Sequence, residues 1–116
     1  MMFSLKTLFP LTLLAATAAA SYSGDMTYYS TEGAAGKCGW TNHNSDHIVA
    51  LSAAQLGGTS ACGKHIRIHY KDKSVTAKVV DLCPGCGSGS IDVTESTFSV
   101  IADPNQGRVH VTWEFI

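Results

Sequence analysis

The sequence predicts a small, mainly β barrel with one or two short helices, stapled by disulfide bonds. Three observations predict this fold class. Several short stretches alternate apolar with polar residues, 11 glycines punctuate the chain between them, and four cysteines can form cross-links. The 116 residues suit one small domain with a modest core. Periodicity alone does not say which barrel this is.

Alternation of apolar and polar side chains predicts the strands. The alternation is clearest where Ile66, Ile68 and Tyr70 share one face and the two histidines and the arginine beside them share the other. Tyr28 and Trp113 fall on apolar faces, so we expect both in the core. Strands are predicted at residues 24–30, 48–51, 64–70, 75–80 and 108–116, with a tight turn at 71–74.

Capping patterns predict two short helical segments. Ser52 suits the N-cap of a single turn that a glycine pair closes. Thr94 is expected to cap a helix over residues 95–102, which would turn Phe98 and Ile101 toward the core.

Residues 1–20 have the pattern of a secretory signal peptide. Lys6 supplies the positive start, an apolar stretch covers residues 8–16, and three alanines ending at Ala20 form a small-residue cleavage site. The apolar stretch is too short to span a membrane. We therefore expect cleavage after Ala20, a secreted, extracellular protein, and one mature barrel domain over residues 21–116.

The charge balance argues against several classes of partner. Without Lys6, seven basic and nine acidic side chains give a formal charge of −2 with neutral histidines. Nucleic acids and anionic membranes select basic surfaces, so neither is expected to bind. His65, His69 and His110 fall on outward strand positions without metal-ligand spacing, so we expect no metal and no other cofactor.

All four cysteines lie in the expected mature domain. An even number of cysteines in a small secreted domain indicates disulfides. The Cys83-x-x-Cys86 pair also fits a thioredoxin-like redox motif or half of a zinc site. The βαβ pattern of the first is missing, however, and no visible ligand spacing completes the second. Structural disulfides are the expected outcome.

Two carboxylates frame the most distinctive stretch of the chain. Asp81 ends a β-branched run, and Asp92 follows a loop rich in glycine. An Asp in such a position commonly forms a turn or an N-cap. The alternative is that both carboxylates face one groove, and the local pattern leaves the two interpretations open. Residues 87–90 between them lack the frame of a nucleophile elbow and are expected to form a flexible loop.

A collinear set of motifs covers nearly the whole expected mature chain: GDMTYY at 24–29, GKCGW at 36–40, IVALS at 48–52, ACGK at 61–64, VVDLCPGC at 79–86, IDVT at 91–94 and VHVTW at 109–113. Together they resemble the secreted double-psi β-barrels of the RlpA-like, barwin and expansin superfamily. The nearest resemblance is to single-domain fungal expansin-like proteins, including loosenins. It implies a six-stranded double-psi β-barrel, and we expect a monomer.

The resemblance also implies a groove that faces cell-wall polysaccharide. Thr27 and Tyr29 match the Thr-x-Tyr of the first strand in expansin-type barrels, and Asp81 matches an acid at the end of a long strand. Asp92 matches the general acid of the related endoglucanases, a residue that expansins also require. We expect Trp40 to line the same groove, since an exposed aromatic ring can stack on a sugar face.

Two departures from the family pattern bear on the chemistry. An inverting glycosidase needs a base as well as an acid, and the base position of the endoglucanases is Thr31 here. Glu32 is adjacent, but a shift of one residue on an extended chain turns the side chain to the other face. RlpA-type lytic transglycosylases use a histidine in the segment that corresponds to residues 53–55, where this chain has none.

We therefore expect a protein that binds β-glucan, cellulose or chitin and loosens it without net hydrolysis. A glycoside hydrolase or lytic transglycosylase that uses Asp92 as its acid remains an alternative. A second alternative is an inhibitor of papain-like cysteine proteases, because barrels of this family from actinobacteria have that activity and a similar Cys-Pro-Gly-Cys loop. A secreted effector is also compatible with the sequence. The related plant barrels imply a Cys38–Cys62 disulfide, which leaves Cys83 to pair with Cys86.

Overall fold

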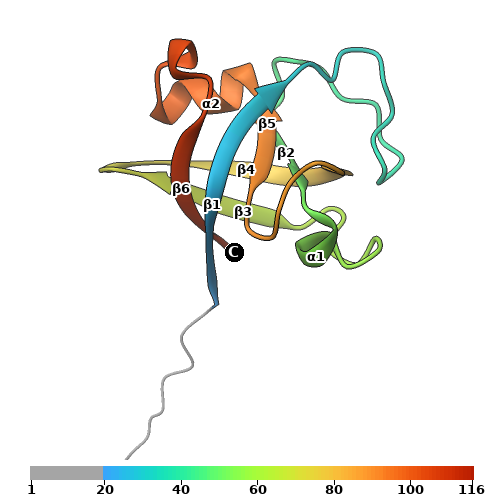
Figure 1. Ribbon diagram of the computed structural model, residues 1–116. Helices are drawn as coiled ribbons and strands as arrows, with labels where there is room; N and C mark the ends of the chain where they lie inside the picture. Colours follow the sequence, from blue (N-terminus) through green and yellow to red (C-terminus); the bar gives the residue numbers. More distant parts are fainter. Residues whose placement is uncertain (1–19) are drawn as a thin grey trace, which may run out of the picture.

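The computed structural model describes residues 20–116, and the expected signal peptide, residues 1–20, lies outside this part except for Ala20. Six strands close into a barrel with the order β1-β5-β2-β4-β3-β6 (Figure 1). The elements, in chain order, are β1 (Ser21–Tyr29), β2 (Ile48–Leu51), α1 (Ala53–Leu56), β3 (His65–Tyr70), β4 (Lys73–Leu82), β5 (Ile91–Thr94), α2 (Glu95–Ile101), the 3₁₀ turn η2 (Pro104–Gln106) and β6 (Val109–Phe115).

The barrel combines two parallel strand pairs with four antiparallel ones. β1 pairs with β5 and β2 with β4 in parallel, and the remaining neighbours are antiparallel. Parallel neighbours require long crossover connections: α1 and β3 lie between β2 and β4 in the chain, and β2, β3 and β4 lie between β1 and β5. This confirms the expected mainly β, six-stranded fold with two short helices. No helix within residues 20–116 is long and apolar enough to cross a membrane.

The barrel interior is filled by the apolar members of the alternating strands. Trp113 is fully buried, stacks on Tyr22 with ring centroids 4.5 Å apart, and donates from Nε1 to the Gly89 carbonyl at 2.9 Å. Tyr28 packs edge-on against Phe98 and donates its hydroxyl to the Pro104 carbonyl, so both expected core aromatics contact the core. Other fully buried members are Met26, Val49, Leu51, Ile66, Ile68, Val79, Ile91 and Val93.

Several boundaries differ from the sequence-based expectation. β1 begins at Ser21 rather than residue 24, because β6 continues to pair with it as far as Glu114. β4 is two residues longer than expected at each end. At its start, Lys71 adopts a left-handed conformation (φ 56°), which allows a two-residue turn in place of the expected four-residue one. β5 was not among the strands predicted from alternation, because three of its four residues are buried and only Asp92 is partly exposed.

The two helices begin where expected, but their caps differ in chemistry. Gly57 closes α1 in a left-handed conformation, as the glycine pair predicted. Thr94 precedes α2, yet its hydroxyl makes no capping bond to the helix backbone. It donates instead to the Asp46 carbonyl at 2.6 Å, with the Thr97 hydroxyl also within 2.7 Å. The expectation of a Thr94 side-chain cap was therefore wrong, because a tertiary acceptor takes the hydroxyl. Similarly, the Ser52 hydroxyl bonds Gln55 Oε1 rather than the backbone of α1.

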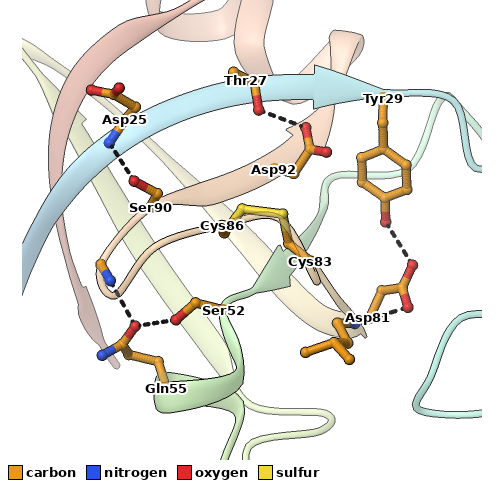
Figure 2. The surroundings of a disulfide bond; sticks show 12 residues. Asp25, Thr27, Tyr29, Ser52, Gln55, Asp81, Cys83, Cys86, Ser90 and Asp92 are labelled. Atoms are coloured by element: carbon orange, nitrogen blue, oxygen red, sulfur yellow. Dashed lines mark hydrogen bonds between the residues drawn. A yellow bond between two sulfur atoms is a disulfide. The ribbon is translucent and has the colours of Figure 1, made fainter.

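The 87–90 loop, expected to be flexible, is anchored on both sides. The Gly89 N–H donates to Gln55 Oε1 at 2.7 Å, and the Ser90 hydroxyl accepts from the Asp25 N–H at 3.1 Å (Figure 2). A Cβ on Gly89 would lie 2.1 Å from the Ser23 carbonyl oxygen, and the residue has φ 88°. Glycine here permits a close approach of two backbones rather than mobility.

Both expected disulfides are present. Cys38 pairs with Cys62, and Cys83 pairs with Cys86. The first joins the 30–47 loop to the segment before β3, and the second closes a small ring after β4. No free cysteine is found in residues 20–116, so none is available to bind zinc as a thiolate.

We expect the Cys38–Cys62 disulfide to stabilise the fold more than the Cys83–Cys86 disulfide does. A Cys38→Ser/Cys62→Ser variant loses the constraint on a loop of 24 residues, and we expect its free energy of unfolding to fall by about 3 kcal/mol. Cys83→Ser/Cys86→Ser should remain folded, because its loop is short. Urea unfolding of both variants provides the comparison, and a larger loss in the second variant would contradict this assignment.

Candidate functional site

Strand register places polar residues in one row across four neighbouring strands. Thr27 of β1 pairs with Asp92 of β5, Asp92 with Ala50 of β2, and Ala50 with Asp81 of β4. Register partners face the same side of a sheet, and the flanking residues Met26 and Ile91 are buried in the barrel. The row therefore faces away from the barrel interior. Thr27, Asp92 and Asp81 are partly exposed, and Ala50, between the two acids, is buried. Two strand spacings of about 4.8 Å separate the backbones of Asp92 and Asp81 by roughly 10 Å.

A β-bulge puts Asp81 into this row. Val49 pairs with Val79, but the next residue of β2, Ala50, pairs with Asp81 rather than with Val80. Without the extra residue Asp81 would be one position out of register and would face the other way. The bulge also leaves the Val80 carbonyl free to accept the Cys38 N–H at 3.2 Å, which ties the 30–47 loop to the strand.

Asp81 is held by three donors. Its Oδ1 accepts the backbone N–H groups of Lys37 at 2.7 Å and Leu82 at 2.8 Å, and its Oδ2 accepts the Tyr29 hydroxyl at 3.4 Å (Figure 2). The Lys37 contact depends on Gly36, since a Cβ there would lie 2.5 Å from the Val80 carbonyl oxygen. Asp81 is thus a fixed acceptor whose orientation is set by the loop.

Tyr29 reaches from β1 toward β4. Burial, followed by the charges of Asp81 and Asp92, raises the pKa of the Tyr29 phenol well above its ordinary value. The hydroxyl therefore keeps its proton and acts as a donor to Asp81 or to a ligand.

Asp92 has a different environment from Asp81. The Thr27 hydroxyl donates to its Oδ1 at 3.0 Å, and this is its one hydrogen bond within residues 20–116. Burial raises the pKa of the Asp92 carboxyl, while the Thr27 hydrogen bond and the Arg108 charge pull that pKa down without cancelling the effect. Of the two acids in the row, Asp92 is the one suited to hold and donate a proton.

Neither Thr31 nor Glu32, the two residues considered as a partner base, offers Asp92 a free carboxylate. Thr31 is buried, with 4% of its surface exposed. The Glu32 carboxylate is on the exposed 30–47 loop, where it contacts His43 Nδ1 at 2.8 Å and accepts the Asn44 N–H at 3.0 Å. These bonds lower the pKa of Glu32, and the Glu32 carboxylate raises the pKa of His43. Glu32 is engaged in shaping the loop.

Trp40 stands apart from the hydrogen-bonded row. Its side chain is 41% exposed, and Lys78 Nζ lies 4.1 Å from the ring centroid. Its ring edge lies against Gly63. Of the three histidines expected on outward strand positions, His69 contacts Glu114 at 2.9 Å, His110 contacts Asp25 at 3.5 Å, and His65 is exposed. The structure thus unites Thr27, Tyr29, Asp81 and Asp92, while a groove role for Trp40 stays a prediction.

The sequence did not identify Arg108 and Asp25 as candidate site residues. Arg108 Nη1 donates to Asp25 Oδ2 at 3.2 Å, next to Thr27. The two are 83 residues apart, and no local pattern in the sequence links them. Only the antiparallel pairing of β1 with β6 brings them together.

Comparison with known proteins agrees with this description, although no protein-family model matches the sequence. The papain inhibitor of Streptomyces mobaraensis is 30% identical over 102 residues, which cover 81% of this chain and 71% of that protein. The solved Streptomyces papain inhibitor superposes with a TM-score of 0.76 over 84% of this chain and 94% of its own. Clavibacter michiganensis expansin matches with a TM-score of 0.77 and 26% identity over 84% of this chain and 50% of its own.

The Aspergillus fumigatus allergen Asp f 7 is 36% identical over 97 residues, 79% of this chain. The chain spans only 36% of that allergen's length. The fold and the disulfides together define a small, disulfide-bonded double-psi β-barrel. The chain belongs to the barwin and expansin superfamily of such barrels.

We expect the ionised Asp92 carboxylate to lower the free energy of unfolding at neutral pH. Because its folded pKa is raised above the ordinary 3.8, the stability it contributes is fully present below pH 3.8 and is lost as pH rises through the folded pKa. Asp92→Asn removes this pH-dependent loss of stability, because an amide does not ionise. The amide oxygen can still accept the hydrogen bond from Thr27. After solvent screening of this half-buried group, we expect the melting midpoint at pH 7 to rise by roughly 1–4 °C.

Thermal melts of the wild type and Asp92→Asn at pH 3 and pH 7 test this expectation. The two proteins should melt together at pH 3. A lower midpoint for the variant at pH 7 would mean that Thr27 and Arg108 stabilise the ionised carboxylate by more than burial disfavours it.

Proposed function

We propose that this is a secreted expansin-like protein of the loosenin type. It binds a cell-wall polysaccharide (β-glucan, cellulose or chitin) and loosens it without net hydrolysis. One observation carries the proposal: the acid Asp92 stands in a row with Tyr29 and Asp81, and no free carboxylate occupies the base position. Thr31 there is buried, and Glu32 is bonded to the outer loop.

The row offers hydrogen-bond donors and acceptors to the hydroxyl groups of a bound sugar chain. Protonated Asp92 donates a hydrogen bond to a glycosidic or hydroxyl oxygen, and the Tyr29 hydroxyl and Asp81 exchange their mutual bond for bonds to ligand hydroxyls. Each such bond replaces one between neighbouring glycan chains. An inverting hydrolysis would also need a base that activates water on the far side of the bond. The row separates glycan chains without breaking a covalent bond.

Two further lines support the proposal. A mutant of Clavibacter michiganensis expansin, a fold neighbour, has been solved in complex with cellohexaose. Two disulfides in a domain of this size are typical of oxidising, extracellular compartments and agree with the signal peptide expected at residues 1–20.

Binding and cleavage should separate in a simple assay. We expect the mature protein to sediment with cellulose, chitin or mixed-linkage glucan, and Asp92→Ala to reduce retention about 5-fold or more, because alanine can neither donate nor accept the hydrogen bond to the glycan. Assays for reducing ends should detect no release. Measurable turnover that Asp92→Asn abolishes would instead establish a hydrolase, and anhydro-sugar ends in digested peptidoglycan would establish a lytic transglycosylase.

A second candidate function is inhibition of a papain-like cysteine protease. The observation that favours it is the match to the Streptomyces papain inhibitor, which spans 94% of that solved chain. The Cys83–Cys86 loop is exposed at Pro84 and Gly85 and is held rigid by its disulfide, as a protease-binding loop must be.

Titration of papain with the mature protein tests this alternative. An inhibitor should abolish papain activity at a molar ratio near one, and Cys83→Ser/Cys86→Ser should weaken that inhibition. Full papain activity at a large excess of the mature protein would exclude this function for papain.

A further inference from the structure

A small hollow lies beside the Thr27–Asp92 pair, at the second half of β1 and the start of β5. Its volume is about 130 Å³, and the residues that line it are Asp25, Thr27, Cys83, Gly85, Cys86, Gly87, Ser90, Ile91 and Arg108. Pockets for drug-sized ligands usually measure about 300–1,000 Å³. The hollow therefore suits a single ring-sized group, and its place beside Thr27 makes it continuous with the row.

One wall of the hollow is a rigid surface without long side chains. The disulfide closes Cys83 to Cys86 into a four-residue ring, and Gly85 and Gly87 add no side chain to it. The Cys83 N–H is bonded to the Leu51 carbonyl at 2.8 Å, which fixes the ring against β2. Figure 2 shows this disulfide between the β1 residues Asp25 and Thr27 and the end of β4. The sulfur atoms of this wall are polarizable and can make van der Waals contact with the C–H groups of a sugar ring.

The opposite wall carries an ion pair that retains free hydrogen-bonding capacity. Arg108 makes one side-chain hydrogen bond within residues 20–116, to Asp25, although a guanidinium has five N–H donors. The Arg108 side chain is 65% exposed and that of Asp25 is 43% exposed. An exposed pair of this kind contributes little to stability, so the fold does not require it. Its donors and its carboxylate acceptor match two neighbouring hydroxyl groups on one ring.

Charge limits which sugar can enter. Asp25 neutralises Arg108, and Asp92 and Asp81 lie farther along the same row. A carboxylated sugar would meet three acidic side chains, with the Arg108 guanidinium and the His110 imidazole near Asp25 as the basic groups beside them, while a neutral sugar is not repelled.

We propose that this hollow is a subsite for one neutral hexopyranose unit of the chain bound across the row, with Arg108 and Asp25 as the residues that recognise its hydroxyls. The inference rests on the proposed function and adds two claims to it. Binding extends past Asp92 on the Arg108 side, and the protein selects neutral over acidic glycans.

Calorimetric titration of the mature protein with cello- and chito-oligosaccharides of two to six units tests the subsite. Arg108→Gln removes the charge, and Arg67→Gln, on the exposed face of β3, is the matched control. For the sugar series that binds, wild-type affinity should increase with each unit until the subsite is filled. Arg108→Gln should lose about 5- to 10-fold in affinity for the hexamer and show no gain from the last unit. Arg67→Gln should match the wild type.

The outcomes separate the two proposals. Unchanged hexamer affinity in Arg108→Gln, with a loss in Tyr29→Phe, would overturn the subsite and leave the groove function standing. Equal losses in Arg67→Gln and Arg108→Gln would also overturn it, because the effect would then be general electrostatics. Tighter binding of hexagalacturonate than of the neutral hexamers would overturn the neutral selectivity. No binding of any oligosaccharide or insoluble glycan would overturn both proposals.

Discussion

The bulge at Val80 is the constraint on which the rest of the site depends. One extra residue in β4 shifts the register against β2 so that Asp81, not Val80, pairs with Ala50. The same extra residue frees the Val80 carbonyl to hold Cys38 at the start of the disulfide-linked loop, and Gly36 can then approach closely enough for Lys37 to bond Asp81. A single irregularity in the ladder therefore aims an acid and anchors the loop that fixes it.

The two acids of the row have separate tasks because the barrel supplies them with different numbers of donors. Asp81 accepts hydrogen bonds from two backbone N–H groups and from a phenol, which hold it as an immobile acceptor. Asp92 has one hydroxyl donor and sits deep enough between β1 and β2 that burial raises its pKa. Proximity to Arg108 limits that rise. Asp81 is thus suited to accept hydrogen bonds and Asp92 to donate a proton. This difference follows from the backbone geometry around each residue.

The 83–90 loop, which carries the Cys83–Cys86 disulfide, is hydrogen-bonded to several parts of the barrel. Gln55 of α1 accepts the Gly89 N–H, the Gly89 carbonyl accepts the buried Trp113 indole, and Ser90 accepts the Asp25 N–H. The 83–90 loop is therefore fastened to the helix, to the core and to β1 at once. This arrangement keeps the wall beside Thr27 rigid although much of the loop is exposed to solvent.

The sequence by itself determined the class of the fold, its main strands and its inward faces, and it singled out Asp81 and Asp92. These follow from local periodicity and from motif order, which are properties of neighbouring residues. Tertiary structure alone decided the Val80 bulge, the diversion of the Thr94 hydroxyl to Asp46 and the anchoring of Gly89. It also decided the meeting of Arg108 with Asp25 across 83 residues. Each of these features depends on a partner from a distant strand or loop. The residues next to a donor or a backbone carbonyl in the sequence do not determine which distant group will bond to it, so no local pattern predicts the contact.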